Sequence, residues 1–163
     1  MAVVPCDQGE FEMSTSRLPY WSLAPKEFEA MRALSDVVHA CSLGKNLLEL
    51  VFLRASQING CAFCIDMHTR DLLEQGEDLQ RVNSVLVWHD TEFFTPRECA
   101  ALAWTEAVTR ISETHAPDAV YNGLRPHFSD AEIVELTFAI TVINSWNRLS
   151  IGFRKPVDKA RLQ

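Results

Sequence analysis

The sequence lacks an excess of positive charge and a long hydrophobic run. Lys and Arg number 15 against 22 Asp and Glu, so the formal net charge is −7, and the basic residues form no cluster. We therefore expect no nucleic-acid partner and no anionic membrane surface. No run approaches the roughly 18 continuous apolar residues of a membrane span, and the first fifteen residues lack the basic start of a secretory signal. These absences predict a cytoplasmic protein.

Cysteine is too scarce and too scattered for a disulfide framework. The five cysteines are an odd number, and only Cys61 and Cys64 lie close together in the sequence. In a reducing compartment such a close pair is more typical of catalysis or metal binding than of a structural cross-link. We assign no function to Cys6, Cys41 and Cys99.

Period-two alternation, which marks half-buried strands, is also missing, as are internal repeats and low-complexity segments. Apolar residues recur instead at helical spacing, and 163 residues with 47% hydrophobic content suit one domain with a sizeable core. We predict an all-α fold of about six or seven helices. An irregular N-terminal arm is expected over residues 1–23, the helical domain over 24–154 and a charged tail over 155–163.

Start and stop signals place the helices within this domain. Pro25 suits the first turn of a helix that Gly44 stops. The next segment, from Leu47 to Ile58, is apolar almost all round, which predicts an interior helix with Glu49 embedded in it. Capping boxes and turn residues begin further helices near Cys61, Glu77, Pro96, Pro117 and Ser129, with residues 88–94 expected as a packed aromatic loop.

Residues 59–68, Asn-Gly-Cys-Ala-Phe-Cys-Ile-Asp-Met-His, carry the clearest chemical signal. If the chain is helical from about Cys61 onward, then Cys61, Cys64 and His68 share one helix face. First-turn N–H groups, the positive end of the helix dipole and a nearby imidazole all favour a thiolate. Helix-dipole reasoning by itself favours Cys61 as the more reactive thiol.

Glu49 is the candidate proton acceptor for these thiols. It lies twelve residues before Cys61, so a sharp turn at Asn59-Gly60 would fold its helix back and bring the carboxylate to the sulfurs. A buried carboxylate has a raised pKa and can exchange protons near neutral pH. The competing interpretation of Glu49 is an ion pair with Arg54 or another arginine.

Plainer interpretations of the other candidates remain open. The cysteines are also suited to filling a core, and His68 to bonding a backbone carbonyl. Cys61, Cys64, His68 and Glu49 could together make a tetrahedral zinc site, but structural zinc sites usually draw a second ligand pair from elsewhere. The scattered histidines and remaining cysteines offer no such pair, so zinc is the weaker interpretation and we assign no metal.

The run from Leu53 to Arg70 closely resembles the core of AhpD-like alkylhydroperoxidases, within the carboxymuconolactone decarboxylase superfamily. Glu49 falls at the spacing of that family's catalytic glutamate. Residues 143–148, Ile-Asn-Ser-Trp-Asn-Arg, resemble a subgroup's C-terminal helix signature, so the resemblance covers roughly residues 47–154. It implies an all-helical fold, a dithiol active site and assembly as a homo-trimer or homo-hexamer.

The resemblance also implies a thiol-dependent peroxidase. Cys64 would attack a hydroperoxide, Cys61 would resolve the sulfenic acid as a disulfide, and Glu49 with His68 would relay protons. A lipoyl or thioredoxin-like dithiol would then reduce the disulfide, so the cycle calls for no cofactor. The chain departs from the family's well-studied peroxidases at Phe63, where they have a histidine, and it holds one helical unit where the best-known member has two.

Two other functions remain as alternatives. A thiol-disulfide redox sensor would oxidise once per subunit and stop, whereas a peroxidase turns over. A decarboxylase or lactone-processing enzyme of the same superfamily needs cationic groups around a carboxylated substrate, and the cysteine pair argues against it. Six aromatic residues could line an apolar peroxide pocket, although aromatic residues on helices more often belong to the core. They are Phe52, Phe63, Trp88, Phe93, Phe94 and Trp146.

Overall fold

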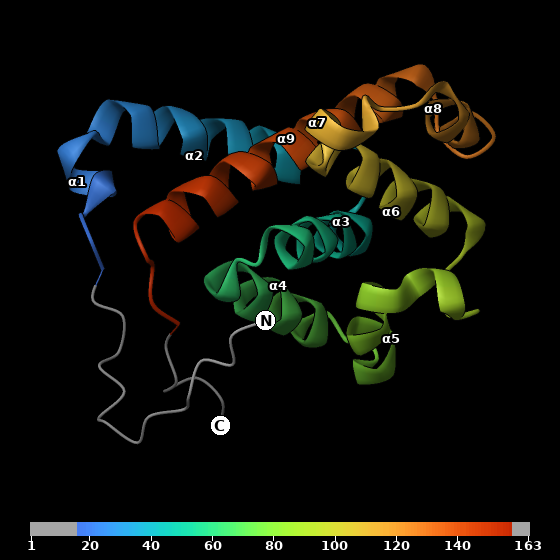
Figure 1. The fold of residues 1–163 in the computed structure, drawn as a ribbon, viewed down its shortest axis with the longest axis horizontal. Helices are drawn as coiled ribbons and strands as arrows, with labels where there is room; N and C mark the ends of the chain where they lie inside the picture. Colours follow the sequence, from blue (N-terminus) through green and yellow to red (C-terminus); the bar gives the residue numbers. More distant parts are fainter. Residues whose placement is uncertain (1–15, 158–163) are drawn as a thin grey trace.

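The structure, a computed structural model, describes residues 16–157 of the chain (Figure 1). Over that range the chain is helical and forms no strand, which confirms the all-α prediction. Most of the expected N-terminal arm and charged tail lies outside these residues. The helices are α1 (Tyr20–Leu23), α2 (Pro25–His39), α3 (Lys45–Asn59), α4 (Ala62–Glu74), α5 (Leu79–Ser84), the 3₁₀ helix η1 (Val85–Asp90), α6 (Pro96–Thr109), α7 (Ile111–Thr114), α8 (Asp118–Leu124) and α9 (Asp130–Gly152).

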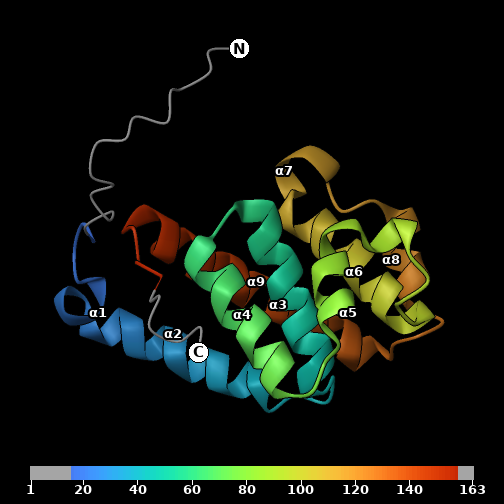
Figure 2. The same cartoon turned by 90° about the horizontal axis from the view of Figure 1, so that it is seen from below.

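Helix α3 occupies the centre of the molecule and packs against α4, α6 and α9. Every residue from Leu47 to Ser56 is buried, as expected for a helix that is apolar almost all round. Figure 2 shows α4 running beside α3, and Figure 1 shows α2 and α9 on the side of α3 away from α5. The two charged residues that α3 carries into the interior, Glu49 and Arg54, therefore need partners from the surrounding helices.

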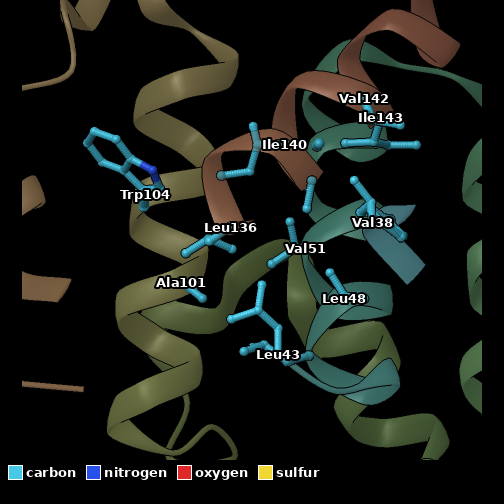
Figure 3. Close-up of a cluster of buried hydrophobic side chains, with 14 of the residues drawn as sticks. Val38, Leu43, Leu48, Val51, Ala101, Trp104, Leu136, Ile140, Val142 and Ile143 are labelled. Atoms are coloured by element: carbon cyan, nitrogen blue, oxygen red, sulfur yellow. The ribbon is translucent and has the colours of Figure 1, made fainter. Parts of the chain in front are cut away.

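Two hydrophobic clusters flank α3. The larger one is built by α2, α3, α6 and α9, and Figure 3 shows its side chains meeting between these helices. The smaller one joins α3 to α4, α5, η1 and α6. Because both clusters pack on one helix, a change in the position of α3 would disturb the whole interior. The fully buried leucines at this centre are Leu48, Leu50, Leu53, Leu72, Leu102 and Leu136.

The local signals in the sequence place most helix ends correctly. Thr95 and Glu98 form the predicted capping box of α6, and Ser129 and Glu132 form that of α9. Each such cap satisfies backbone N–H groups that the first helical turn leaves unpaired, and a cap is worth about 1 kcal/mol. Pro25 stands in the first turn of α2 as expected.

Short helices are where the prediction differs from the structure. Residues 88–94 were expected as a loop, but Trp88, His89 and Asp90 belong to η1. The N-terminal arm was expected to be irregular, yet its residues Tyr20–Leu23 form α1. Helices of four to six residues are too short to show a 3.6-residue period, so the sequence pattern does not reveal them.

The first described residues are fastened to the end of α9. The N–H of Arg17 donates to the carbonyl of Phe153 at 3.0 Å, and the Tyr20 ring stacks on the Phe153 ring with centroids 5.1 Å apart. This contact holds α1 and the start of α2 beside the C-terminal end of α9, which Figure 1 shows at the same edge of the molecule. That edge borders the cavity described below.

None of the helices within residues 16–157 is both long enough and apolar enough to cross a membrane.

Candidate active site

The turn between α3 and α4 creates the site. Gly60 has a φ of 71°, a left-handed conformation that glycine adopts without steric cost, and it ends α3. The N–H of Cys61 donates to the carbonyl of Ser56 at 3.0 Å, which closes the turn. Cys61 is thereby placed at the N-cap of α4, where its Sγ accepts from the N–H of Cys64 at 3.4 Å.

Cys61 and Cys64 are joined as a disulfide in this structure. Their Cα atoms are 5.3 Å apart, and both side chains are buried. The N-terminal end of α4 supplies unpaired N–H groups and the positive end of the helix dipole to both sulfurs. These features stabilise a thiolate whenever the bond is reduced. The two cysteines are therefore bonded to each other and are a candidate redox couple rather than two separate core cysteines.

His68 and Glu49 form a buried hydrogen-bonded pair next to this couple. His68 follows Cys64 by one helical turn, so the two residues lie on the same face of α4. Its Nδ1 is 2.7 Å from Oε2 of Glu49 on α3, and the side chains are 5% and 8% exposed. The predicted turn does bring Glu49 back to the cysteine helix, but its carboxylate contacts the imidazole of His68 rather than a sulfur.

The second ring nitrogen of His68 is unused. Its Nε2 is buried and has no hydrogen-bonding partner within residues 16–157. A proton on Nδ1 that is donated to Glu49 leaves Nε2 with a free lone pair, which is the form of imidazole that acts as a base. A buried polar atom without a partner is costly, so an unpaired Nε2 beside a redox couple indicates a functional role.

The Glu49–His68 pair opens onto a cavity of about 340 Å³. Its apolar walls include Phe28, Phe52 and Trp146, and the Phe52 ring lies against the His68 ring with centroids 5.2 Å apart. Three of the aromatic residues expected at a peroxide pocket, Phe52, Phe63 and Trp146, line it. The other three lie elsewhere: Trp88 bonds Glu106, Phe94 belongs to the smaller core cluster and Phe93 is 39% exposed.

A second carboxylate, Asp71, joins the pair at the cavity wall. It follows His68 by three residues on α4. A carboxylate oxygen of Glu49, a ring nitrogen of His68 and a carboxylate oxygen of Asp71 all lie within 4.8 Å of one another. Burial raises the pKa of the Asp71 carboxyl, and the negative charge of Glu49 raises it further. Arg70, its neighbour in sequence, instead pairs with Asp66 at 2.7 Å.

Phe63, which stands where the well-studied peroxidases have a histidine, is covered by Lys155. The Nζ of Lys155 is 3.8 Å from the centre of the Phe63 ring, a cation–π contact at the cavity wall. Burial lowers the pKa of this lysine. The segment that follows α9 therefore closes the cavity over the residue next to Cys64.

Three asparagines hold the turn in place. Asn59, the last residue of α3, donates both N–H groups of its side chain to α9, to Asn144 at 2.9 Å and to Asn147 at 2.8 Å. Asn147 in turn donates to the Ser56 hydroxyl at 3.0 Å. Both α9 asparagines are buried, so these bonds fix the end of α3, and with it Gly60 and Cys61, against α9.

The arrangement resolves two alternatives left open by the sequence. Arg54 pairs with Glu106, whose Oε1 is 2.7 Å away, so the expected competing pair between Arg54 and Glu49 does not form. The sulfurs are bonded to each other, so in this disulfide form neither is free to bind zinc. In this disulfide form the Glu49 carboxylate and the His68 imidazole are hydrogen-bonded to each other.

The sequence grouped four residues that the structure also places close together, and it left out two others at the same cavity. The structure places Cys61, Cys64, His68 and Glu49 in one neighbourhood, as predicted. It adds Asp71 and Lys155, to which we had assigned no role. Spacing could have indicated Asp71, because residues three apart on a helix are neighbours. No signal in the sequence could have brought Lys155 over Phe63, since that contact depends on how the chain leaves α9.

Comparisons with known proteins agree with this architecture. Residues 25–107 match the model of the carboxymuconolactone decarboxylase family. The uncharacterised protein YdfG of Bacillus subtilis is 39% identical over 138 residues, which cover 85% of this chain and 94% of YdfG. The family match over residues 25–107 includes the cysteine pair, Glu49, His68 and Asp71, whereas the α9 asparagines lie beyond it.

Two solved structures share the fold. The Agrobacterium tumefaciens protein ATU0492, of unknown function and proposed to be an antioxidant defence protein AhpD, is 44% identical with a TM-score of 0.86, covering 88% of this chain and 98% of that one. An uncharacterised peroxidase-related protein from Ralstonia eutropha, described as an alkylhydroperoxidase AhpD core, is 22% identical with a TM-score of 0.76. The match covers 85% of this chain and 74% of that one, and at this identity it supports the fold alone.

Proposed function

Because this chain belongs to the carboxymuconolactone decarboxylase family, as an AhpD-like member, we propose that it is a thiol-dependent peroxidase that reduces hydroperoxides. The observation that carries the proposal is the buried Glu49–His68 hydrogen bond one helical turn from Cys64. A redox sensor needs only two thiols that can oxidise. A buried carboxylate and imidazole beside the thiols suit repeated proton transfer, which turnover requires.

The first step is the loss of the Cys64 thiol proton to Nε2 of His68. Glu49 holds the imidazole in the tautomer that can accept this proton, and its negative charge favours the imidazolium that results. The thiolate then attacks the distal oxygen of the hydroperoxide. The O–O bond breaks, the sulfur is oxidised to a sulfenic acid, and the leaving alkoxide takes up a proton to become an alcohol.

The remaining steps restore the dithiol. Cys61 attacks the sulfenic sulfur, the disulfide forms and water leaves. An external dithiol then reduces this bond through two exchange reactions and is itself oxidised to a disulfide. A lipoyl group or a thioredoxin-like protein would serve. Because the Cys61 and Cys64 side chains are buried, the reductant needs a slender reach, which favours a lipoyl arm over a bulky thiol surface.

We also propose that the chain works as a homo-trimer or homo-hexamer. Helices α2 and α9 present an apolar surface, here called the α2–α9 face, formed by Leu34, Val37, Val134 and Phe138. Each of these four side chains is at least 38% exposed, although the sequence pattern of α2 suggested a buried apolar stripe. A second copy would bury this surface.

Peroxide consumption in the presence of dihydrolipoamide or dithiothreitol tests the function. We expect wild-type protein to turn over many times per subunit and C64S to be inactive. C61S, reduced beforehand and assayed without dithiol, should consume one equivalent of peroxide without forming the disulfide. A wild-type protein that oxidises once and stops, despite excess dithiol, would contradict the peroxidase and support a redox sensor.

A further inference from the structure

The proposed reaction needs a proton not only at the thiol but also at the leaving oxygen of the hydroperoxide. The Glu49–His68 pair is already engaged in taking up the thiol proton. Cleavage of the O–O bond releases an alkoxide, a strong base that leaves quickly only if it is protonated as it departs. His68 has just taken the thiol proton, and its Nδ1 is engaged with Glu49 at 2.7 Å. A separate acid on the cavity wall would relieve the imidazole of delivering that proton itself.

Asp71 is placed to be that acid. It lies on the cavity wall together with Glu49 and His68. A carboxylate oxygen of Asp71, one of Glu49 and a ring nitrogen of His68 lie within 4.8 Å of one another. Glu49 and His68 are already bonded to each other, whereas Asp71 is only partly buried and borders the open space of the cavity. This separation is short enough for one water molecule to connect Asp71 with the buried pair.

The charges around Asp71 favour its protonated form. Burial raises the pKa of its carboxyl, and Glu49 across from it on α3 adds to this effect, while His68 and Arg70 on its own helix act in the opposite direction. Two carboxyl groups this close do not both ionise easily, so one of them tends to keep a proton. Other charged or titratable groups on the same cavity wall are Arg32, Asp36 and His39 of α2 and Lys155 after α9.

We propose that Asp71 is the general acid that protonates the leaving oxygen, an inference that rests on the proposed peroxidase function. In the balanced step, Cys64–SH and ROOH give Cys64–SOH and ROH. The sulfur gives an electron pair to the distal oxygen, the O–O pair leaves with RO⁻, and RO⁻ takes the Asp71 proton. The proton that Cys64 gave to His68 then passes to the deprotonated Asp71. Glu49, His68 and Asp71 therefore end the step in the protonation states in which they began it.

Two reactions of the same thiol separate this role from a structural one. Alkylation by iodoacetamide needs the Cys64 thiolate, but iodide leaves without a proton. In D71N we therefore expect alkylation of the reduced protein to stay within twofold of wild type, while the rate constant for an alkyl hydroperoxide falls about 10²-fold, the low end for loss of a general acid. C61S, reduced beforehand, serves as the background so that only Cys64 reacts in this motif, with C61S/C64S subtracted for Cys6, Cys41 and Cys99.

The leaving group provides a second test on the same variant. A peracid releases a carboxylate, which is a far weaker base than an alkoxide and departs without an acid catalyst. D71N should therefore reduce peracetic acid at close to the wild-type rate, although it is slow with the alkyl hydroperoxide. The matched control is D66N on the same helix, because Asp66 pairs with Arg70 and does not line the cavity. We expect D66N to behave like wild type with both oxidants.

Each other outcome is informative. Equal losses in alkylation, peracid and alkyl hydroperoxide reduction would place Asp71 in thiolate formation or folding and overturn the proposal, as would a D71N rate equal to wild type with all oxidants. If chelator-treated wild type loses activity as D71N does, and D71N loses a stoichiometric divalent ion, Asp71 is a metal ligand instead. A wild-type protein with no peroxide turnover contradicts the proposed function itself, a result distinct from any effect of D71N.

Discussion

The side-chain nitrogen of Asn59 lies 2.8 Å from the side-chain oxygen of Asn147, although the two residues are 88 positions apart in the chain. Asn147 is fully buried, and its own amide N–H donates to the Ser56 hydroxyl, which is also fully buried. One side chain of α9 therefore satisfies two polar groups in the last turn of α3. The next residues along the chain are Gly60 and Cys61. The contact therefore fixes the end of α3 from which the cysteine pair follows.

Replacing Asn147 with alanine should destabilise the protein measurably. The change leaves the Ser56 hydroxyl and one N–H of Asn59 without their partners inside the molecule, which costs about 1–3 kcal/mol for each buried group. Urea unfolding of N147A, followed by circular dichroism, should show a lower midpoint with an unchanged slope. N122A is the matched control, because Asn122 is exposed on α8 and should unfold like wild type. Equal midpoints for N147A and wild type would contradict a supporting role.

Replacing Glu49 with glutamine tests the charge of the buried pair. The glutamine oxygen can still accept from Nδ1 of His68, so the ring keeps its position, but the negative charge that favours the imidazolium is gone. We expect the rate constant for Cys64 with peroxide to fall about 10–100-fold, toward the low end of general-base effects. Unlike D71N, this variant should also be slow to react with iodoacetamide, because thiolate formation itself is impaired. Undiminished alkylation in E49Q would show that His68 acts without the carboxylate.

The sequence predicted the site better than it predicted the surroundings of the site. The cysteine pair, His68 and Glu49 could be placed because they lie on two consecutive helices joined by one recognisable turn, so local spacing fixes their geometry. The all-α fold, the interior helix and both capping boxes rest on equally local signals. The sequence did not indicate Asp71, because a single aspartate on a helix resembles any surface acid. Only the structure shows that Glu49 of α3 lies close to it across the cavity.

Contacts between distant segments could not be predicted in this way. The Lys155–Phe63 contact joins residues 92 positions apart, and the bonds from Asn59 to α9 span a similar distance. The aromatic residues show the same limit, since nothing in the sequence separates Trp88, Phe93 and Phe94, which lie outside the cavity, from the aromatic residues that line it. Periodicity reports which face of a helix is apolar, but it does not report which helix that face meets.

Asp71 should make the protein less stable at neutral pH than an uncharged residue would. Its folded-state pKa is raised, so the folded protein binds a proton more tightly than the unfolded chain does. The charged form is therefore disfavoured in the folded state at pH above both pKa values, and the penalty fades as pH falls below the ordinary value. D71N should melt up to about 2–4 °C higher than wild type at pH 7.5, and the difference should shrink at pH 4. A lower melting temperature for D71N at pH 7.5 would contradict this sign.

Glu106 should show the opposite pH dependence. Burial alone would raise the pKa of this carboxyl, but hydrogen bonds from Trp88 and Arg54 and the charge of Arg54 hold it below its ordinary value of 4.5. A lowered pKa stabilises the fold above that value, and the stability is lost as pH falls toward the folded-state pKa. Removing the charge in E106Q leaves the buried Arg54 guanidinium uncompensated, at a cost of about 3 kcal/mol at pH 7. The difference in the free energy of unfolding between wild type and E106Q, measured by urea unfolding, should be smaller at pH 3.5 than at pH 7.

The α2–α9 face should be the place where copies of the chain meet. Val37 and Phe138 are 68% and 53% exposed and line one hollow between the two helices, an arrangement that leaves large apolar side chains in water unless something covers them. In light scattering coupled to size exclusion we expect wild type at the mass of a trimer or hexamer, and F138E at a smaller mass, because a charge buried in an apolar contact has no partner there. L79E provides the comparison, since Leu79 is 56% exposed on α5, away from α2 and α9 (Figure 1). Dissociation by L79E but not by F138E would move the interface to α5, and a monomeric wild-type protein would contradict self-association altogether.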